Sequence, residues 1–220
     1  QHGFARDMDF TMISQSEDEV WFAVKDTEET YAKYPFHFEL EVGYRLEGKE
    51  LTVMWKVKNV NDSDMHFSIG AHPAFNCPLK SDEKQEDYFL FFDTDKPFES
   101  SIIGADGFVT EDTEFFHTEG GKLAITANLF DNNTMVIEHD QTHEVSLLTP
   151  EGREYVKVTY TAPLVGIWTP IEKNAPFICI EPWYGRSDRA SFNQQLTERE
   201  YGQKLAQGEI FEASYQIEVK

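Results

Sequence analysis

The chain has 220 residues, of which 40 are acidic and 19 are lysine or arginine, and its formal net charge is −21. This balance argues against nucleic acid or an anionic membrane surface as a partner, because phosphate binding needs clustered cations, and a neutral, polar small molecule fits better. No run of about 18 or more apolar residues is present, so no transmembrane helix is predicted.

A chain of this length suits one domain, since single hydrophobic cores stop growing at roughly 250 to 300 residues. No internal repeat, linker or shift in composition divides the sequence, and we expect one domain over residues 1–220. The only cysteines, Cys77 and Cys179, lie far apart in apolar stretches. This usage predicts free thiols and a cytoplasmic protein.

Alternation of apolar and polar residues, the pattern of a strand with one buried face, begins at residues 36–46 and resumes over residues 51–57. The link between these two runs is short enough for an antiparallel hairpin. Similar runs follow at residues 87–92, 134–140, 143–148, 154–160, 177–181 and 211–220. The one polar helical candidate, at residues 191–202, is short. The pattern therefore predicts an all-β fold, a large β-sandwich.

A histidine occurs in an unusual setting in "SIGAHPAFNCPL", where His72 lies among small and apolar residues. Gly70 and Ala71 leave room for close approach of a ligand. Pro73 biases His72 toward an extended conformation and removes a ladder donor, which ends a strand. Such a histidine can be a core residue, but a strand end that faces a cleft also suits a general acid.

The stretch "FICIEPWYGRSD" repeats this construction, because an apolar strand places Glu181 directly before Pro182, and Trp183 and Tyr184 follow. Sugars have apolar C–H faces that pack on aromatic rings, and hydroxyls that bind carboxylates. The stretch therefore predicts a sugar site, against the alternative of an exposed glutamate beside a core tryptophan.

The opening "QHGFARD" is a third polar element. If it is extended, His2, Phe4 and Arg6 project to one side, so an imidazole and a guanidinium could reach the same cleft. Three polar elements from the start, middle and end of the chain, each beside glycine or proline, form a stronger constellation than any one of them.

The motifs "HGFAR", "GAHPAFNCPL" and "EPWYGRSD" together resemble the aldose 1-epimerase (galactose mutarotase) family, in particular its bacterial branch related to the protein LacX. This resemblance runs from the first residue to the last. It implies a β-supersandwich, and because the family's usual chain has further strands before "HGFAR", we expect this chain to lack N-terminal strands.

The resemblance also implies an activity, the interconversion of α and β anomers of a hexose such as galactose or glucose by a monomer or homodimer that needs no metal or organic cofactor. In this family pattern His72 matches the general acid, Glu181 the general base, and His2 a histidine that hydrogen-bonds the sugar near its ring oxygen. Near neutrality we expect an ionised Glu181 and a partly protonated His72.

Further substrate contacts are expected from three aromatic residues that wall the cleft and from two arginines: Phe75, Trp168, Trp183, Arg6 and Arg186. The arginines could bind either sugar hydroxyls or a phosphate, so a hexose 6-phosphate stays open as the substrate.

One position departs from the family pattern. Family members hold sugar hydroxyls with an aspartate at the position where this chain has Asn133. Asp131 or Asp140 could take over this role, and the sequence does not decide between them.

Two other classes of function compete with a mutarotase. A carbohydrate-binding β-sandwich without activity would keep the aromatic residues but would not require both His72 and Glu181. A jelly-roll metalloenzyme could use His2, His66 and His72, but the last two are six residues apart on one strand face, too far apart to chelate as an adjacent pair. No metal is therefore expected.

The acid–base hypothesis also predicts a geometry. We expect His72 at a strand end on the concave side of the larger sheet, with its ring facing Glu181 across a gap wide enough for a pyranose. The two groups should be too far apart for a mutual bond, because each must come within about 2.6 to 3.2 Å of its own substrate oxygen.

Overall fold

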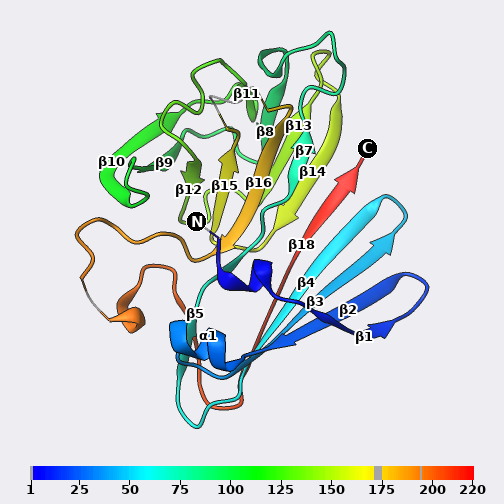
Figure 1. Ribbon diagram of the computed structural model, residues 1–220. Coiled ribbons are helices and arrows are strands. Elements are labelled where there is room, and N and C mark those ends of the chain that lie inside the picture. The colour runs from blue at the N-terminus through cyan, green and yellow to red at the C-terminus, as the bar shows by residue number, and fades with distance from the viewer. Residues whose placement is uncertain (1, 171–174, 194) are drawn as a thin grey trace.

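Two antiparallel β-sheets pack face to face in the computed structural model, which describes residues 2–170, 175–193 and 195–220 (Figure 1). The larger sheet has nine strands, in the order β1 (Thr11–Gln15), β2 (Glu19–Lys25), β3 (Phe38–Glu47), β4 (Glu50–Asn59), β18 (Ile210–Val219), β14 (Glu154–Tyr160), β13 (Glu144–Leu148), β8 (Phe89–Phe92) and β11 (Lys122–Ala124). The predicted all-β sandwich is confirmed.

The smaller sheet has seven strands and carries the candidate site. Its order is β10 (Val109–Phe116), β9 (Phe98–Ile103), β12 (Met135–Ile137), β15 (Leu164–Trp168), β16 (Phe177–Tyr184) and β6 (Ile69–Gly70), and β7 (Ala74–Asn76) pairs with β16 as well. A separate pair consists of β5 (Met65–Phe67) and β17 (Gln203–Leu205).

Helices are short in the described residues. They are α1 (Glu28–Lys33) and the 3₁₀ turns η1 (Phe4–Asp7), η2 (Gln85–Asp87) and η4 (Leu196–Glu198). The helical candidate at residues 191–202 is thus reduced to η4, and its residue 194 lies outside the described residues. None of the helices in the described residues has the length and apolar composition of a membrane span.

The period of two explains where the core forms. Val53 and Trp55 of β4 face the other sheet and meet Ile178 and Ile180 of β16 in one apolar cluster. The alternation on β3 has a different outcome along its length, because Phe38 and Leu40 are buried whereas Tyr44 and Leu46 are exposed. The end of the β3–β4 hairpin that carries its turn therefore extends beyond the residues that bury Phe38 and Leu40 (Figure 1).

Candidate active site

His72 occupies a break between two short strands that both pair with β16. Gly70 of β6 is opposite Trp183, and Ala74 of β7 is opposite Cys179. The register is therefore unbroken, and it places His72 directly opposite Glu181. The predicted strand end at Pro73 is confirmed, since β6 ends at Gly70 and β7 begins only at Ala74.

Backbone hydrogen bonds fix this pairing on both sides. The N–H of Ala71 donates to the carbonyl of Pro182 at 3.0 Å, and the N–H of Ile180 donates to the carbonyl of Pro73 at 3.2 Å. His72 and Glu181 lie between these two pairs, at a position without ladder bonds, where opposing side chains of antiparallel strands come closest. The ladder thus brings the imidazole and the carboxylate together.

The two side chains touch. Nδ1 of His72 lies 3.0 Å from Oε1 of Glu181, and the exposed fractions of the two side chains are 34% and 7%. The expected gap between them is therefore wrong for the free protein. A carboxyl group buried this deeply is costly to ionise.

The site lies on the outer face of the smaller sheet, not on the larger sheet as expected. Ile178 and Ile180 point into the core, so Cys179, Glu181 and Trp183 alternate onto the opposite face. Glu181 is also not at a strand end, because β16 continues through Pro182 to Tyr184. Proline is tolerated here because another donor replaces its missing N–H.

That donor is the indole of Trp183. In a hydrogen-bonded antiparallel pair each residue donates to the other, so the carbonyl of Ala71 should receive an N–H from residue 182. Pro182 has none, and Nε1 of Trp183 donates to this carbonyl at 3.2 Å instead. The indole also donates a hydrogen bond to Glu181. This bond lowers the pKa of the carboxyl group and so partly offsets the larger effect of burial, which raises it.

Two glycines make room for this indole. A Cβ at Gly166 would lie 2.4 Å from the six-membered ring, and a Cβ at Gly70 would lie 2.6 Å from the five-membered ring. The ring of Trp183 therefore spans β15, β16 and β6 and ties the His72 segment to Glu181. These contacts give Trp183 a positioning role, and the expectation that it walls the sugar cleft stays a prediction.

We expect Trp183→Phe to lower the free energy of unfolding by about 1 to 3 kcal/mol, because the buried carbonyl of Ala71 loses its donor. Urea denaturation measures the effect. Trp21→Phe is the matched control, since Nε1 of Trp21 donates to the carboxylate of Glu19, which water can solvate after the change. Equal losses in the two variants would contradict the role assigned to Trp183.

Two aromatic side chains flank the ring of His72. The ring of His2 stacks on it, with centroids 4.7 Å apart and planes 30° apart, and Trp168 meets it edge-on at 5.9 Å. The segment that begins at His2 thus lies near β16 of the smaller sheet (Figure 1). The structure brings His2 and Trp168, two predicted substrate contacts, into contact with His72.

Burial controls the proton equilibria of the pair. It raises the pKa of Glu181 to about 8, and it lowers the pKa of His72, which the positive charges of His2 and Arg6 lower further. This differs from the expected ionised glutamate and partly protonated histidine. At pH values between these two pKa values, the free pair holds one proton in total.

The two arginines of the prediction are both paired. The guanidinium of Arg6 binds Asp7 at 3.0 Å and stays largely exposed. The side chain of Arg186 is 1% exposed and forms ion pairs with Glu138 and Glu200. Arg186 also borders a cavity of about 270 Å³. Among the described residues, the ion-pair partners of the two arginines are these carboxylates and not Glu181.

Two aromatic residues belong to the core. Phe75 is opposite Ile178 and packs against the main apolar cluster. Tyr184 packs there too, against Trp55. Antiparallel partners share a face, so both lie on the side of the sheet away from Glu181. Phe75 therefore does not wall the site.

The segment that departs from the family pattern precedes β12. Asn133 has a left-handed backbone with φ of 73°, and Asp140 has φ of 54°. Met135 pairs with Ile167, so the residues just before β12 lie toward the Trp168 end of β15. Asp140 is at the other end, where its N–H donates to the carbonyl of Pro163.

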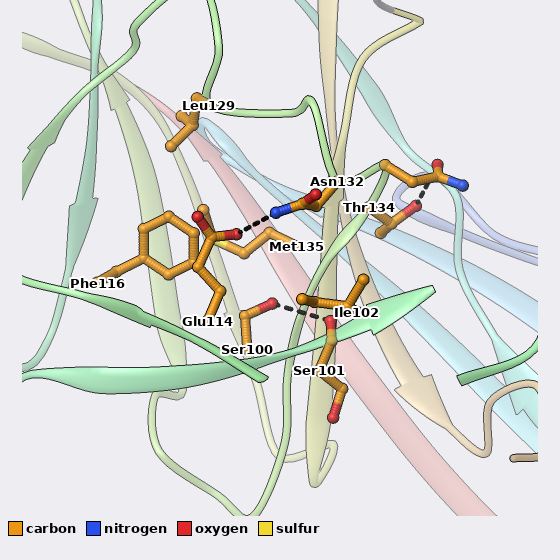
Figure 2. Close-up of a pocket in the computed structure, with 10 residues that line it drawn as sticks. Ser100, Ser101, Ile102, Glu114, Phe116, Leu129, Asn132, Thr134 and Met135 are labelled. Atoms are coloured by element: carbon orange, nitrogen blue, oxygen red, sulfur yellow. Dashed lines mark hydrogen bonds between the residues drawn. The ribbon is translucent and has the colours of Figure 1, made fainter. Parts of the chain in front are cut away.

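A small cavity lies beside this segment (Figure 2). Asn132 points across it and donates to Glu114 at 3.1 Å, and Ser100 and Ser101 form its floor. Its volume of about 10 Å³ holds one water molecule at most, so it is not a sugar site.

Sequence reasoning missed Cys179, whose side chain shares the outer face with Glu181 and lies close to both His72 and Glu181. The alternation within "FICIE" contains this signal, because residues 179 and 181 are two apart on one strand.

Comparison with known proteins agrees with the motifs. The model of the family described as aldose 1-epimerase matches residues 1–218. The plasmid-encoded protein LacX of Lactococcus lactis subsp. lactis is 30% identical over 228 residues, which is all of this chain and 74% of that protein.

Solved structures show the same fold. A galactose mutarotase related enzyme from Lactobacillus acidophilus is 31% identical, with a TM-score of 0.92 over all of this chain and 74% of its own. A galactose mutarotase-like protein from Lactobacillus casei is 31% identical, with a TM-score of 0.90 over all of this chain and 76% of its own. With a family match that spans residues 1–218, the chain belongs to the aldose 1-epimerase family.

Proposed function

We propose that the protein is a mutarotase that interconverts the α and β anomers of a hexose such as galactose or glucose. The observation that carries this proposal is the contact of His72 with the buried carboxylate of Glu181, flanked by His2 and Trp168. The pair places a general acid and a general base side by side on the outer face of the smaller sheet, and the reaction requires one of each.

The reaction needs two proton transfers. Glu181 takes the proton of the anomeric hydroxyl, and His72 gives a proton to the ring oxygen. The ring opens to the aldehyde, rotates about C1–C2 and closes on the other face. Between the two pKa values the pair holds one proton, and in the absence of sugar that proton is on Glu181. The assigned roles therefore require that it pass to His72 as the sugar enters and separates the two side chains.

A neutral sugar is favoured over a hexose 6-phosphate. A phosphate needs an unpaired cation, and both candidate arginines already bind carboxylates, Arg6 with Asp7 and Arg186 with Glu138 and Glu200. Trp168 offers an aromatic edge and face to the apolar side of a pyranose. We further propose that residues 1–220 form one domain that acts in the cytoplasm as a monomer or homodimer.

Polarimetry on freshly dissolved α-glucose, α-galactose and the corresponding 6-phosphates tests the proposal. We expect the approach to anomeric equilibrium to accelerate for a neutral hexose and to a smaller extent for its 6-phosphate. Sugar binding without acceleration would instead support a carbohydrate-binding β-sandwich.

A further inference from the structure

We propose that the same face of the smaller sheet binds a Zn²⁺ ion through His72, Cys179 and Glu181, and that the ion blocks the sugar. The blocking effect rests on the proposed function, whereas the binding site does not. A ring nitrogen of His72, Sγ of Cys179 and a carboxylate oxygen of Glu181 all lie within 4.8 Å of one another.

The backbone holds these three groups in place. Cys179 and Glu181 are two residues apart on β16 and share its outer face, and His72 is directly opposite Glu181. Ligand atoms around a tetrahedral zinc ion are about 3.3 to 3.8 Å apart, since each lies about 2.0 to 2.3 Å from the metal. Small side-chain rotations would therefore complete three corners and leave the fourth for water.

The donor set selects the metal. A thiolate with an imidazole and a carboxylate suits Zn²⁺, whereas Mg²⁺ prefers oxygen ligands alone. Burial raises the pKa of the Cys179 thiol to about 12, so zinc must displace the thiol proton, which passes to the solvent. The set differs from the three histidines considered from the sequence, because His66 lies in β5 and pairs with Lys204.

Zinc at this position would occupy both catalytic groups. The ring nitrogen bound to zinc could no longer carry the transferred proton, and the carboxylate oxygen bound to zinc could no longer receive one. Zinc and sugar should therefore compete for the site.

Competition with a chromogenic zinc chelator measures the affinity of the full chain. We expect a one-to-one site that Cys179→Ala and Cys179→Ser weaken by more than about tenfold, since even outer-shell changes at zinc sites cost about 10- to 100-fold. Cys77→Ala is the matched control, because Cys77 is also a buried free thiol but lies in the core, and it should bind zinc like the wild type. A Mg²⁺ titration should not displace the zinc.

X-ray absorption on the one-to-one zinc complex of the wild type tests the site without any substitution. One sulfur at about 2.3 Å from zinc supports the proposal. A shell of oxygen alone, as the acidic surface would supply, overturns it, as do equal affinities of the wild type and both Cys179 variants.

Polarimetry then tests the blocking effect. We expect zinc to slow mutarotation in competition with sugar, a chelator to restore the rate, and the fractional inhibition to fall in the Cys179 variants. A sulfur-bound zinc in a protein without mutarotase activity would leave the metal site standing and refute the proposed function. An active protein whose rate saturating zinc leaves unchanged would overturn the block.

Discussion

Glu181→Gln is expected to lower kcat for mutarotation by about 10²- to 10⁴-fold, the range that a positioned general base contributes. Glutamine has nearly the same shape, but its amide cannot take the proton of the anomeric hydroxyl. The fold should be retained, because glutamine fits the space of the glutamate beside His72 and the variant has no buried carboxyl group to ionise. Polarimetry gives the rate and thermal denaturation gives the stability.

Glu154→Gln serves as the control for this change. Glu154 lies on β14 of the larger sheet, where its carboxylate accepts a hydrogen bond from Ser146 at 2.6 Å, away from the candidate site. This variant should keep the wild-type rate. If Glu181→Gln were as active as Glu154→Gln, Glu181 would not be the base, and the role of the pair would have to be reassigned.

The sequence was sufficient to predict the fold class because the signal is local. Alternation over residues 51–57 and 154–160 requires one buried face, and two such faces build a sandwich. The break at Pro73 was equally local, since a proline lacks the ladder donor whatever its surroundings. His72 and Glu181 were singled out by a residue directly before a proline in each stretch, their roles as acid and base followed from the resemblance, and their contact came only from the three-dimensional register.

Other features depended on groups that are distant in the sequence. Pro182 indicates the end of a strand, yet β16 continues because Trp183 supplies the missing donor to Ala71, and Gly166 leaves room for its ring. The alternation of apolar and polar residues does not show that the indole of Trp183 replaces the missing N–H of Pro182. Phe75 similarly looks like a cleft residue near His72 in the sequence. The two residues are three apart on an extended segment and face opposite sides, and only the pairing of Phe75 with Ile178 shows which side is the core.

The protonation of the pair was also beyond the sequence. Reference pKa values predict an ionised glutamate, and the burial that raises the pKa of Glu181 to about 8 comes from packing in three dimensions, which the sequence pattern does not contain.

His72→Asn should lower kcat by about 10²- to 10⁴-fold and leave KM within a few fold of the wild type. The loss falls on kcat because protonation of the ring oxygen occurs in the transition state, whereas a residue that only holds the sugar would act on both states. The amide nitrogen of asparagine lies near the position of Nδ1 and can still donate to Glu181, so the buried carboxylate keeps its partner. The initial rate of mutarotation over a range of hexose concentrations separates the two constants.

His66→Asn is the matched control, because His66 lies in β5, outside the smaller sheet, and its backbone carbonyl, which accepts from Tyr34, is unaffected by the change. It should have wild-type kcat and KM. A His72→Asn variant with normal kcat and a raised KM would make His72 a binding residue. The proton for the ring oxygen would then have to come from another group on this face, and His2, whose ring stacks on that of His72, is the nearest candidate among the described residues. The double variant His2→Asn with His72→Asn would distinguish the two assignments, because it should lose no further kcat if His72 alone is the acid.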